Sequence, residues 1–265
     1  MNIYLHELKT YRINTLIWIL SLSGFMVMMM CFYPLIKDDM DTFMELINNF
    51  PPAMKAIMGV VYEDFSSPIG FYGYIFTYVG LIEAIQAMNL GVGIVSKEER
   101  ERTADFLMTK PVARKTIMTA KVLTAATIFF LTNIIYSIGT YAMLAWLSEG
   151  EVDIKHLFLM NLSLLIMQFI FFSIGLAVTG FLKKVRAVLP ISMGMIFTFY
   201  AISAFAVTSK EDKLRYATPF QYFTVQQIFE ESSYEVSFLI LSGAIIIIGI
   251  VLSYYRYLRK NIPAV

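Results

Sequence analysis

The stretch VLTAATIFFLTNIIYSIGTYAMLAWLS, residues 122–148, decides the fold class of this chain. It contains no Asp, Glu, Lys, Arg or His. A helix rises 1.5 Å per residue, so about 20 residues cross a hydrocarbon core about 30 Å thick. This stretch is longer than that. We therefore predict that it forms a membrane-spanning helix.

Five other stretches of the sequence are similar to residues 122–148 in length and apolar character. Four of them carry no charge, and the fifth contains a single acid, Glu83. A central acid costs about 2.5–3.5 kcal/mol on an insertion scale, which the surrounding Leu, Ile, Phe and Val residues offset at roughly 0.3–0.6 kcal/mol each. The expected fold is an all-α membrane protein, one domain over residues 1–265, with six transmembrane helices at about 13–36, 66–96, 122–148, 157–182, 187–209 and 236–255.

The amino-acid composition is typical of a membrane protein. The chain is 58% hydrophobic and 15% charged, whereas roughly a quarter of the residues in a soluble domain are charged. The single cysteine, Cys31, excludes a disulfide framework. The first apolar run is too long for a signal-peptide core, so we expect it to be retained as a span.

The basic residues predict the orientation. If the N-terminus is cytoplasmic, the cytoplasmic segments hold fifteen Lys and Arg residues and the outer segments hold six. This positive-inside bias places both termini in the cytoplasm. Residues 2–14 place Tyr4, Leu8 and Tyr11 on one face, which predicts a short helix along the inner membrane interface before the first span. The outer segment 210–235 is interpreted as an amphipathic re-entrant or surface helix whose Phe220, Phe223, Ile228 and Phe229 dip into the interface.

The segment SKEERERTADFLMTKPVARK, residues 96–115, is called the connector below. It carries seven charged residues between Lys97 and Asp105, which bilayer lipid cannot solvate. Helix-forming residues continue to Met108, and Pro111 then breaks the helix and can open the next one. The pattern predicts a short helix, a break and a long helix that enters the third span. Two interpretations stay open: a docking helix for a cytoplasmic partner, or a solvated loop that reverses the chain.

Several catalytic motifs are absent from the sequence. Without G-x-x-x-x-G-K-[S/T] the chain lacks the loop that holds nucleotide phosphates, and neither H-E-x-x-H nor G-x-S-x-G occurs. The Glu98-Glu99 pair resembles part of a prenyl-protease motif, but Thr103 stands where that motif requires arginine. We therefore expect no enzyme activity and no metal site. The acidic cluster Asp38, Asp39 and Asp41 is interpreted as a solvated helix edge.

Polar residues also occur inside the predicted spans. Glu83, Gln86 and Asn89 are three residues apart, so they follow one side of the second span. An ionisable residue at membrane depth indicates a functional site, such as a transport pathway. The structural alternative is a set of hydrogen bonds across helices to Asn133 or Gln168, and the sequence leaves both open.

The connector and the helix after it resemble a known family. The stretch EERERTADFLMTKPVARKTIMTAK, residues 98–121, is similar to the E-x-x-x-G-T-x-x-x-L-L-x-x-P-V-S-R-x-x-I-x-x-x-K segment of ABC-2 type transporter permeases. Arg102 replaces the usual glycine. Residues 50–59 with 66–71, and residues 217–223, resemble the first and last outer loops of that family. The matching connector positions are Thr103, Phe106, Leu107, Met108, Pro111, Val112, Arg114, Ile117 and Lys121.

The resemblance implies the membrane subunit of a bacterial ABC exporter in the cell membrane. Two permease copies would pair, each docked on a cytoplasmic ABC ATPase subunit. ATP and Mg would bind to the ATPase, this chain would bind no cofactor, and the connector would act as the coupling helix. The residues then expected to couple to the ATPase are Glu98, Glu99, Arg100, Arg102, Thr103, Asp105, Phe106, Leu107, Lys110, Pro111 and Arg114.

The expected cargo is amphipathic or hydrophobic: an antimicrobial or toxin peptide, a drug or a lipid. Membrane lipid is the expected surrounding, and no nucleic-acid partner is expected. Two alternatives come from other classes. One is a non-transporting membrane anchor or sensor that recruits a cytoplasmic partner through the connector. The other is an ion-coupled carrier that uses Glu83.

Overall fold

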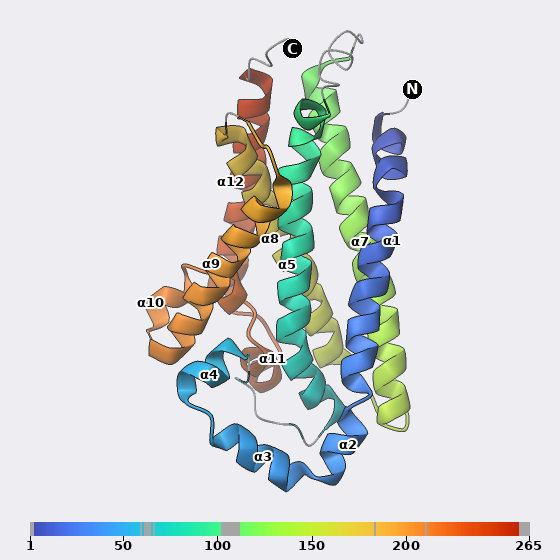
Figure 1. The fold of residues 1–265 in the computed structure, drawn as a ribbon, viewed down its shortest axis with the longest axis vertical. Helices are drawn as coiled ribbons and strands as arrows, with labels where there is room; N and C mark the ends of the chain where they lie inside the picture. The colour runs from blue at the N-terminus through green and yellow to red at the C-terminus, as the bar shows by residue number, and fades with distance from the viewer. Residues whose placement is uncertain are drawn as a thin grey trace.

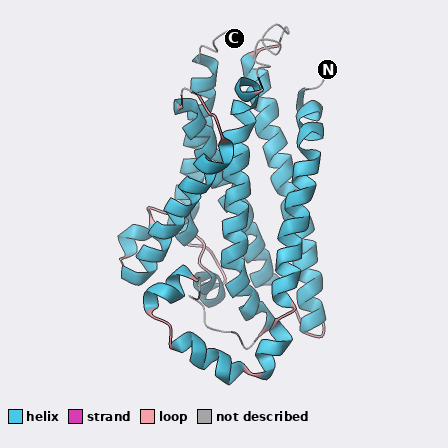
Figure 2. Ribbon diagram, viewed as in Figure 1, coloured by secondary structure: helices cyan, strands magenta, loops and turns pink. Residues whose placement is uncertain are grey.

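The computed structural model describes residues 3–58, 60, 65, 67–101, 112–182, 184–209 and 211–259. Within these ranges the elements are helices joined by turns, without strands (Figure 2). This confirms the prediction of an all-α membrane protein. The six candidate membrane spans (Figure 1) are α1 (Ile3–Met30) with α2 (Tyr33–Asp38), α5 (Pro68–Arg100), α7 (Arg114–Leu147), α8 (Ile154–Phe181), α9 (Val188–Ser209) and α12 (Val236–Arg259).

The helices α5 and α8 form the centre of the bundle. In their most apolar stretches 72% and 61% of residues are buried, whereas the share is 22% for α1, α9 and α12. Glycines let the two central backbones approach closely. A Cβ atom placed on Gly91 would lie 2.5 Å from the Phe172 carbonyl oxygen, and one on Gly175 would lie 2.9 Å from the Met88 carbonyl oxygen. Small residues at such contacts are typical of helix packing in membranes.

The N-terminal segment differs from the sequence expectation. Residues Ile3–Met30 form one continuous helix rather than an interfacial helix followed by a span. The first turns pack into the bundle: the Tyr4 and Thr127 hydroxyls are 2.9 Å apart, and Glu7 is buried. The prediction of a separate helix was therefore wrong, because these polar residues find partners on α5 and α7 and do not need the membrane interface.

Short helices close the bundle at the end opposite Ile3 and Arg259 (Figure 1). After α2 come α3 (Met40–Asn48) and α4 (Pro52–Ile57), and two tyrosines attach this segment to the spans. Tyr200 of α9 donates to the Ile57 carbonyl oxygen at 2.6 Å, and Tyr78 of α5 donates to that of Met58 at 2.7 Å. The acids at the junction of α2 and α3 are exposed, namely Asp38, Asp39 and Asp41.

The segment before α12 packs against the protein. It consists of α10 (Asp212–Arg215), a 3-10 turn labelled η1 (Pro219–Gln221) and α11 (Val225–Glu231). Ile228 and Phe223 are buried, the Phe220 ring lies 5.0 Å from that of Phe171 on α8, and Phe229 stacks on His156. The apolar face predicted to enter the membrane interface is thus covered largely by α8 and α9.

Candidate functional site

A chain of polar side chains crosses the middle of the bundle between α5, α7 and α8. Asn133 Nδ2 donates to Gln168 Oε1 at 2.7 Å, and Gln168 Nε2 donates to Gln86 Oε1 at 3.3 Å. Gln86 Nε2 reaches the Thr132 hydroxyl at 3.5 Å. These four residues are called the amide chain below. In membranes such bonds average about 0.6 kcal/mol each, so they join the three helices without fixing them rigidly.

Glu83 lies one turn from the amide chain but is not part of it. Its side chain is 0% exposed, and neither carboxylate oxygen has a hydrogen-bond partner among the described residues. The structural alternative for Glu83, hydrogen bonds to Asn133 or Gln168, is not formed, because those two amides pair with each other and with Gln86. Among the described residues, Glu83 is therefore a buried acid without a hydrogen-bond partner.

A second polar group lies beyond Glu83, on the side away from the chain termini. The Tyr72 hydroxyl donates to Asn161 Oδ1 at 2.9 Å and is 3.1 Å from the Tyr136 hydroxyl. The two tyrosine hydroxyls are engaged with one another and with Asn161, so they leave the Glu83 carboxylate unpaired.

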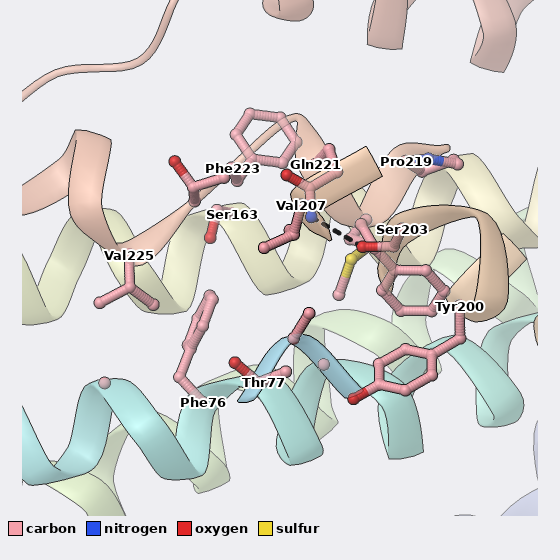
Figure 3. Close-up of a pocket in the computed structure, with 16 residues that line it drawn as sticks. Phe76, Thr77, Ser163, Tyr200, Ser203, Val207, Pro219, Gln221, Phe223 and Val225 are labelled. Atoms are coloured by element: carbon pink, nitrogen blue, oxygen red, sulfur yellow. Dashed lines mark hydrogen bonds between the residues drawn. The ribbon is translucent and has the colours of Figure 1, made fainter. Parts of the chain in front are cut away.

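An aromatic pocket of about 80 Å³ opens between α5, α8, α9 and the segment before α12. Phe76 and Thr77 of α5 line one side in Figure 3, and Phe223 and Gln221 line another. Gln221 Nε2 donates to the Ser203 hydroxyl at 2.7 Å, the bond drawn as a dashed line. This cavity is called the aromatic pocket below.

The aromatic pocket ends one turn before Glu83. Its last α5 residue is Gly80, and the terminal carbon of Met167 lies 2.8 Å from where a Gly80 Cβ would be. The flexible Met167 side chain therefore occupies the space over Gly80. Met167 itself lines the pocket, so its rotation would change the pocket's inner end.

A second cavity of about 190 Å³ lies closer to the chain termini. Gln86 and Asn89 line it from α5, and Asn14 and Thr15 line it from α1. This cavity is called the polar pocket below. Asn89 thus faces the polar pocket rather than joining the amide chain. Glu83 lies between the two pockets along α5, after Gly80 of the aromatic pocket and before Gln86 of the polar pocket.

Four charged residues meet at the end of the bundle that carries the connector. Lys121 of α7 is fully buried, and its Nζ contacts Glu98 Oε1 at 2.5 Å and Glu7 Oε1 at 3.6 Å. Lys97 Nζ lies 3.5 Å from Glu7 Oε2. These residues, the charge cluster below, balance two lysines against two acids and join α1, α5 and α7. Lys121 also donates to the Ile94 carbonyl oxygen.

Sequence reasoning missed Glu7 and Lys121 as site residues. A signal for Lys121 was present: it lies on the same helical face as Ile117, Thr124 and Ile128, all of which are buried. A lysine on a buried helical face needs an acidic partner. No comparable signal exists for Glu7, because a helix along the membrane interface would allow its carboxylate to face water.

The connector residues are only partly described. The helix α5 continues through Lys97–Arg100, so the first charges of the predicted short helix extend the second span. Glu98 faces inward to Lys121, Glu99 is half-buried, and Arg100 is exposed. Arg114, at the start of α7, donates to the Leu258 carbonyl oxygen of α12 at 3.4 Å. The other predicted coupling residues lie outside the described residues: Arg102, Thr103, Asp105, Phe106, Leu107, Lys110 and Pro111.

Comparison with known protein families identifies the family of this chain. A family described as ABC-2 family transporter protein matches residues 1–262. The chain belongs to this family. Comparison with curated proteins gave no match. An ABC-2 permease is the membrane component of an ABC transporter, which works with a cytoplasmic ATPase.

In this ABC-2 permease the charge cluster lies on both sides of the connector residues 102–111. Lys97 and Glu98 lie near the end of α5, before residues 102–111, and Lys121 lies in α7 after them. Both flanks of the connector are thus joined by ion pairs, together with Glu7 of the first span.

Proposed function

We propose that this permease is the membrane subunit of an ATP-driven exporter that moves an amphipathic or hydrophobic cargo out of the cell. Two permease copies assemble with two ATPase subunits in a bacterial cell membrane, with the termini and the connector in the cytoplasm. The charge cluster is the observation that carries the proposal. It lies at the base of the one segment whose sequence resembles the coupling element of the family.

The charge cluster supports a coupling role because of its burial. Separating Lys121 from Glu98 would break the shortest ion pair of a fully buried lysine, which is strongly unfavourable. The flanks of the connector therefore move as a unit with α1, α5 and α7. Since α5 lines both pockets, its displacement changes the access of each pocket.

The aromatic pocket supports a cargo with an apolar part. Its wall includes Phe76, Met167, Phe220 and Phe223. Aromatic rings and a flexible thioether accommodate apolar groups of different shapes. Hydroxyl and amide groups, such as those of Ser203 and Gln221, add a few polar contacts. This combination fits an amphipathic molecule better than a sugar chain or a small ion.

The coupling role predicts an uncoupled phenotype for two connector variants. Phe106→Ala and Arg114→Glu each remove a predicted ATPase contact, so we expect the complex to keep hydrolysing ATP while transport falls by about tenfold, the equivalent of about 1.4 kcal/mol. The measurement pairs ATP hydrolysis with ATP-dependent uptake of a hydrophobic fluorescent dye in inverted membrane vesicles containing both subunits.

The matched control for Arg114→Glu is Lys115→Glu. It makes the same charge change one residue further along α7, at an exposed position. We expect this control to transport as the wild type does. Wild-type transport by both Phe106→Ala and Arg114→Glu would remove the coupling role from those residues.

A further inference from the structure

Glu83 is the only ionisable acid or base that the sequence places in the middle of a span. The uncharged stretches of α7, α8, α9 and α12 contain no Lys, Arg or His at that depth. On the facing helix α7, Lys121 contacts the carbonyl oxygen of Ile94. Ile94 lies eleven residues after Glu83, or about 16 Å along the helix axis. Lys121 is also paired in the charge cluster, so it does not neutralise Glu83.

The two carboxylate oxygens of Glu83 have no hydrogen-bond partner in the part of the chain that the structure describes. A buried polar group without a hydrogen bond is unfavourable, and a buried carboxylate is more so. The groups around it are engaged elsewhere: Gln86 in the amide chain, and Tyr72 and Tyr136 with each other. A leucine would pack at this depth without that cost. The acid therefore indicates a cationic ligand that is present during only part of the working cycle.

The position of Glu83 indicates the shape of that ligand. The aromatic pocket ends one turn away at Gly80, and the polar pocket begins one turn away at Gln86. Neither pocket is lined by Glu83 itself, and Met167 fills the space over Gly80. Rings such as Phe76 in the aromatic pocket favour an apolar body and also attract a cation through their faces.

We propose that Glu83 binds the positively charged group of an amphipathic cargo whose apolar part occupies the aromatic pocket. Binding moves the Met167 side chain away from Gly80 and gives the Glu83 carboxylate its missing partner. The inference deepens the proposed export function by naming the cargo class as cationic amphipaths. The binding step requires only the permease, whereas transport also requires the ATPase.

The test measures binding of two probes to the purified permease without its ATPase. Tetraphenylphosphonium is an aromatic cation, and tetraphenylborate has nearly the same shape with a negative charge. By equilibrium dialysis in detergent, we expect the wild type to bind the cation at least about tenfold more tightly than the anion. We expect Glu83→Gln to weaken cation binding by at least about tenfold, because a buried charge pair loses one member.

Two further variants separate binding from folding. Asp212→Asn removes one negative charge from an exposed position on α10 and should change cation affinity less than twofold. Glu83→Asp keeps the charge and should keep the preference for the cation, even if Glu83→Gln does not fold. A wild-type permease that binds both probes equally, or a folded Glu83→Gln protein with unchanged cation affinity, would overturn the proposal. Absence of ATP-driven transport alone would instead count against the export function.

Discussion

Replacing Lys121 with methionine is expected to destabilise the permease by about 3–5 kcal/mol, because breaking a buried ion pair leaves an uncompensated charge. Lys121 is fully buried and is the only member of the charge cluster that contacts both acids, Glu7 and Glu98. Methionine fills a similar volume, so the loss would come from charge rather than from a cavity. Unfolding of the purified protein in mixed micelles with increasing SDS measures the change.

Two comparisons isolate the charge effect of Lys121. Lys115→Met makes the same substitution six residues earlier on α7 at an exposed position, and we expect a change within about 0.5 kcal/mol. Adding Glu98→Gln to Lys121→Met restores the charge balance, so the double variant should be more stable than Lys121→Met alone. Equal stability of the Lys121→Met and Lys115→Met proteins would show that the charge cluster does not hold the helices together.

Replacing Gly91 with alanine is expected to have an effect of similar size on the centre of the bundle. The new Cβ would lie 2.5 Å from the Phe172 carbonyl oxygen and 3.2 Å from the Gly175 Cα. Both obstacles are backbone atoms, so α5 and α8 would have to separate. Overpacking costs typically about 1–3 kcal/mol, and a clash with backbone belongs at the upper end of that range. The same SDS unfolding assay measures it.

Gly194 provides the matched control for Gly91. It lies in α9, where an added Cβ meets no atom within 4 Å. Gly194→Ala should leave stability unchanged or raise it slightly, since alanine favours the helix more than glycine does. If Gly91→Ala and Gly194→Ala unfold at the same SDS fraction, the close approach of α5 and α8 is not what stabilises the centre.

The spans could be predicted because each depends on a local property, the length of an uncharged apolar run. The N-terminal helix could not be placed in the same way. Tyr4 and Leu8 form an apolar face that suits either a membrane surface or a neighbouring helix, and local sequence does not distinguish the two. The structure selects the second, through the Tyr4 contact with Thr127 and the burial of Glu7.

The site was predictable to a similar extent. The polar residues of the spans stand out against an apolar background, so Glu83, Gln86, Asn133 and Gln168 were all found from the sequence. Which of them pair with one another depends on how α5, α7 and α8 are rotated about their axes, which composition does not encode. The structure pairs Gln86 with Gln168 and leaves Glu83 alone. The same limit applies to Lys121, whose partners are 114 and 23 residues away in the chain.

We propose different roles for the charge cluster and for Glu83. The charge cluster at the base of the connector receives the motion, and α5 carries it to the two pockets on either side of Glu83. Lys97 and Glu98 are the last turn of the same helix whose middle holds Glu83. One rigid element therefore joins the predicted ATPase contact to the predicted cargo contact.

The decisive measurement is ATP hydrolysis by the complex that is purified through a tag on this chain. We expect a separate P-loop ATPase to co-purify with the chain from its native membranes, and the complex to hydrolyse ATP. The chain itself, expressed alone, should not hydrolyse ATP, since it lacks the phosphate-binding loop. Purification of a folded, homodimeric chain with no ATPase bound, under conditions that keep the membrane complex intact, would contradict it.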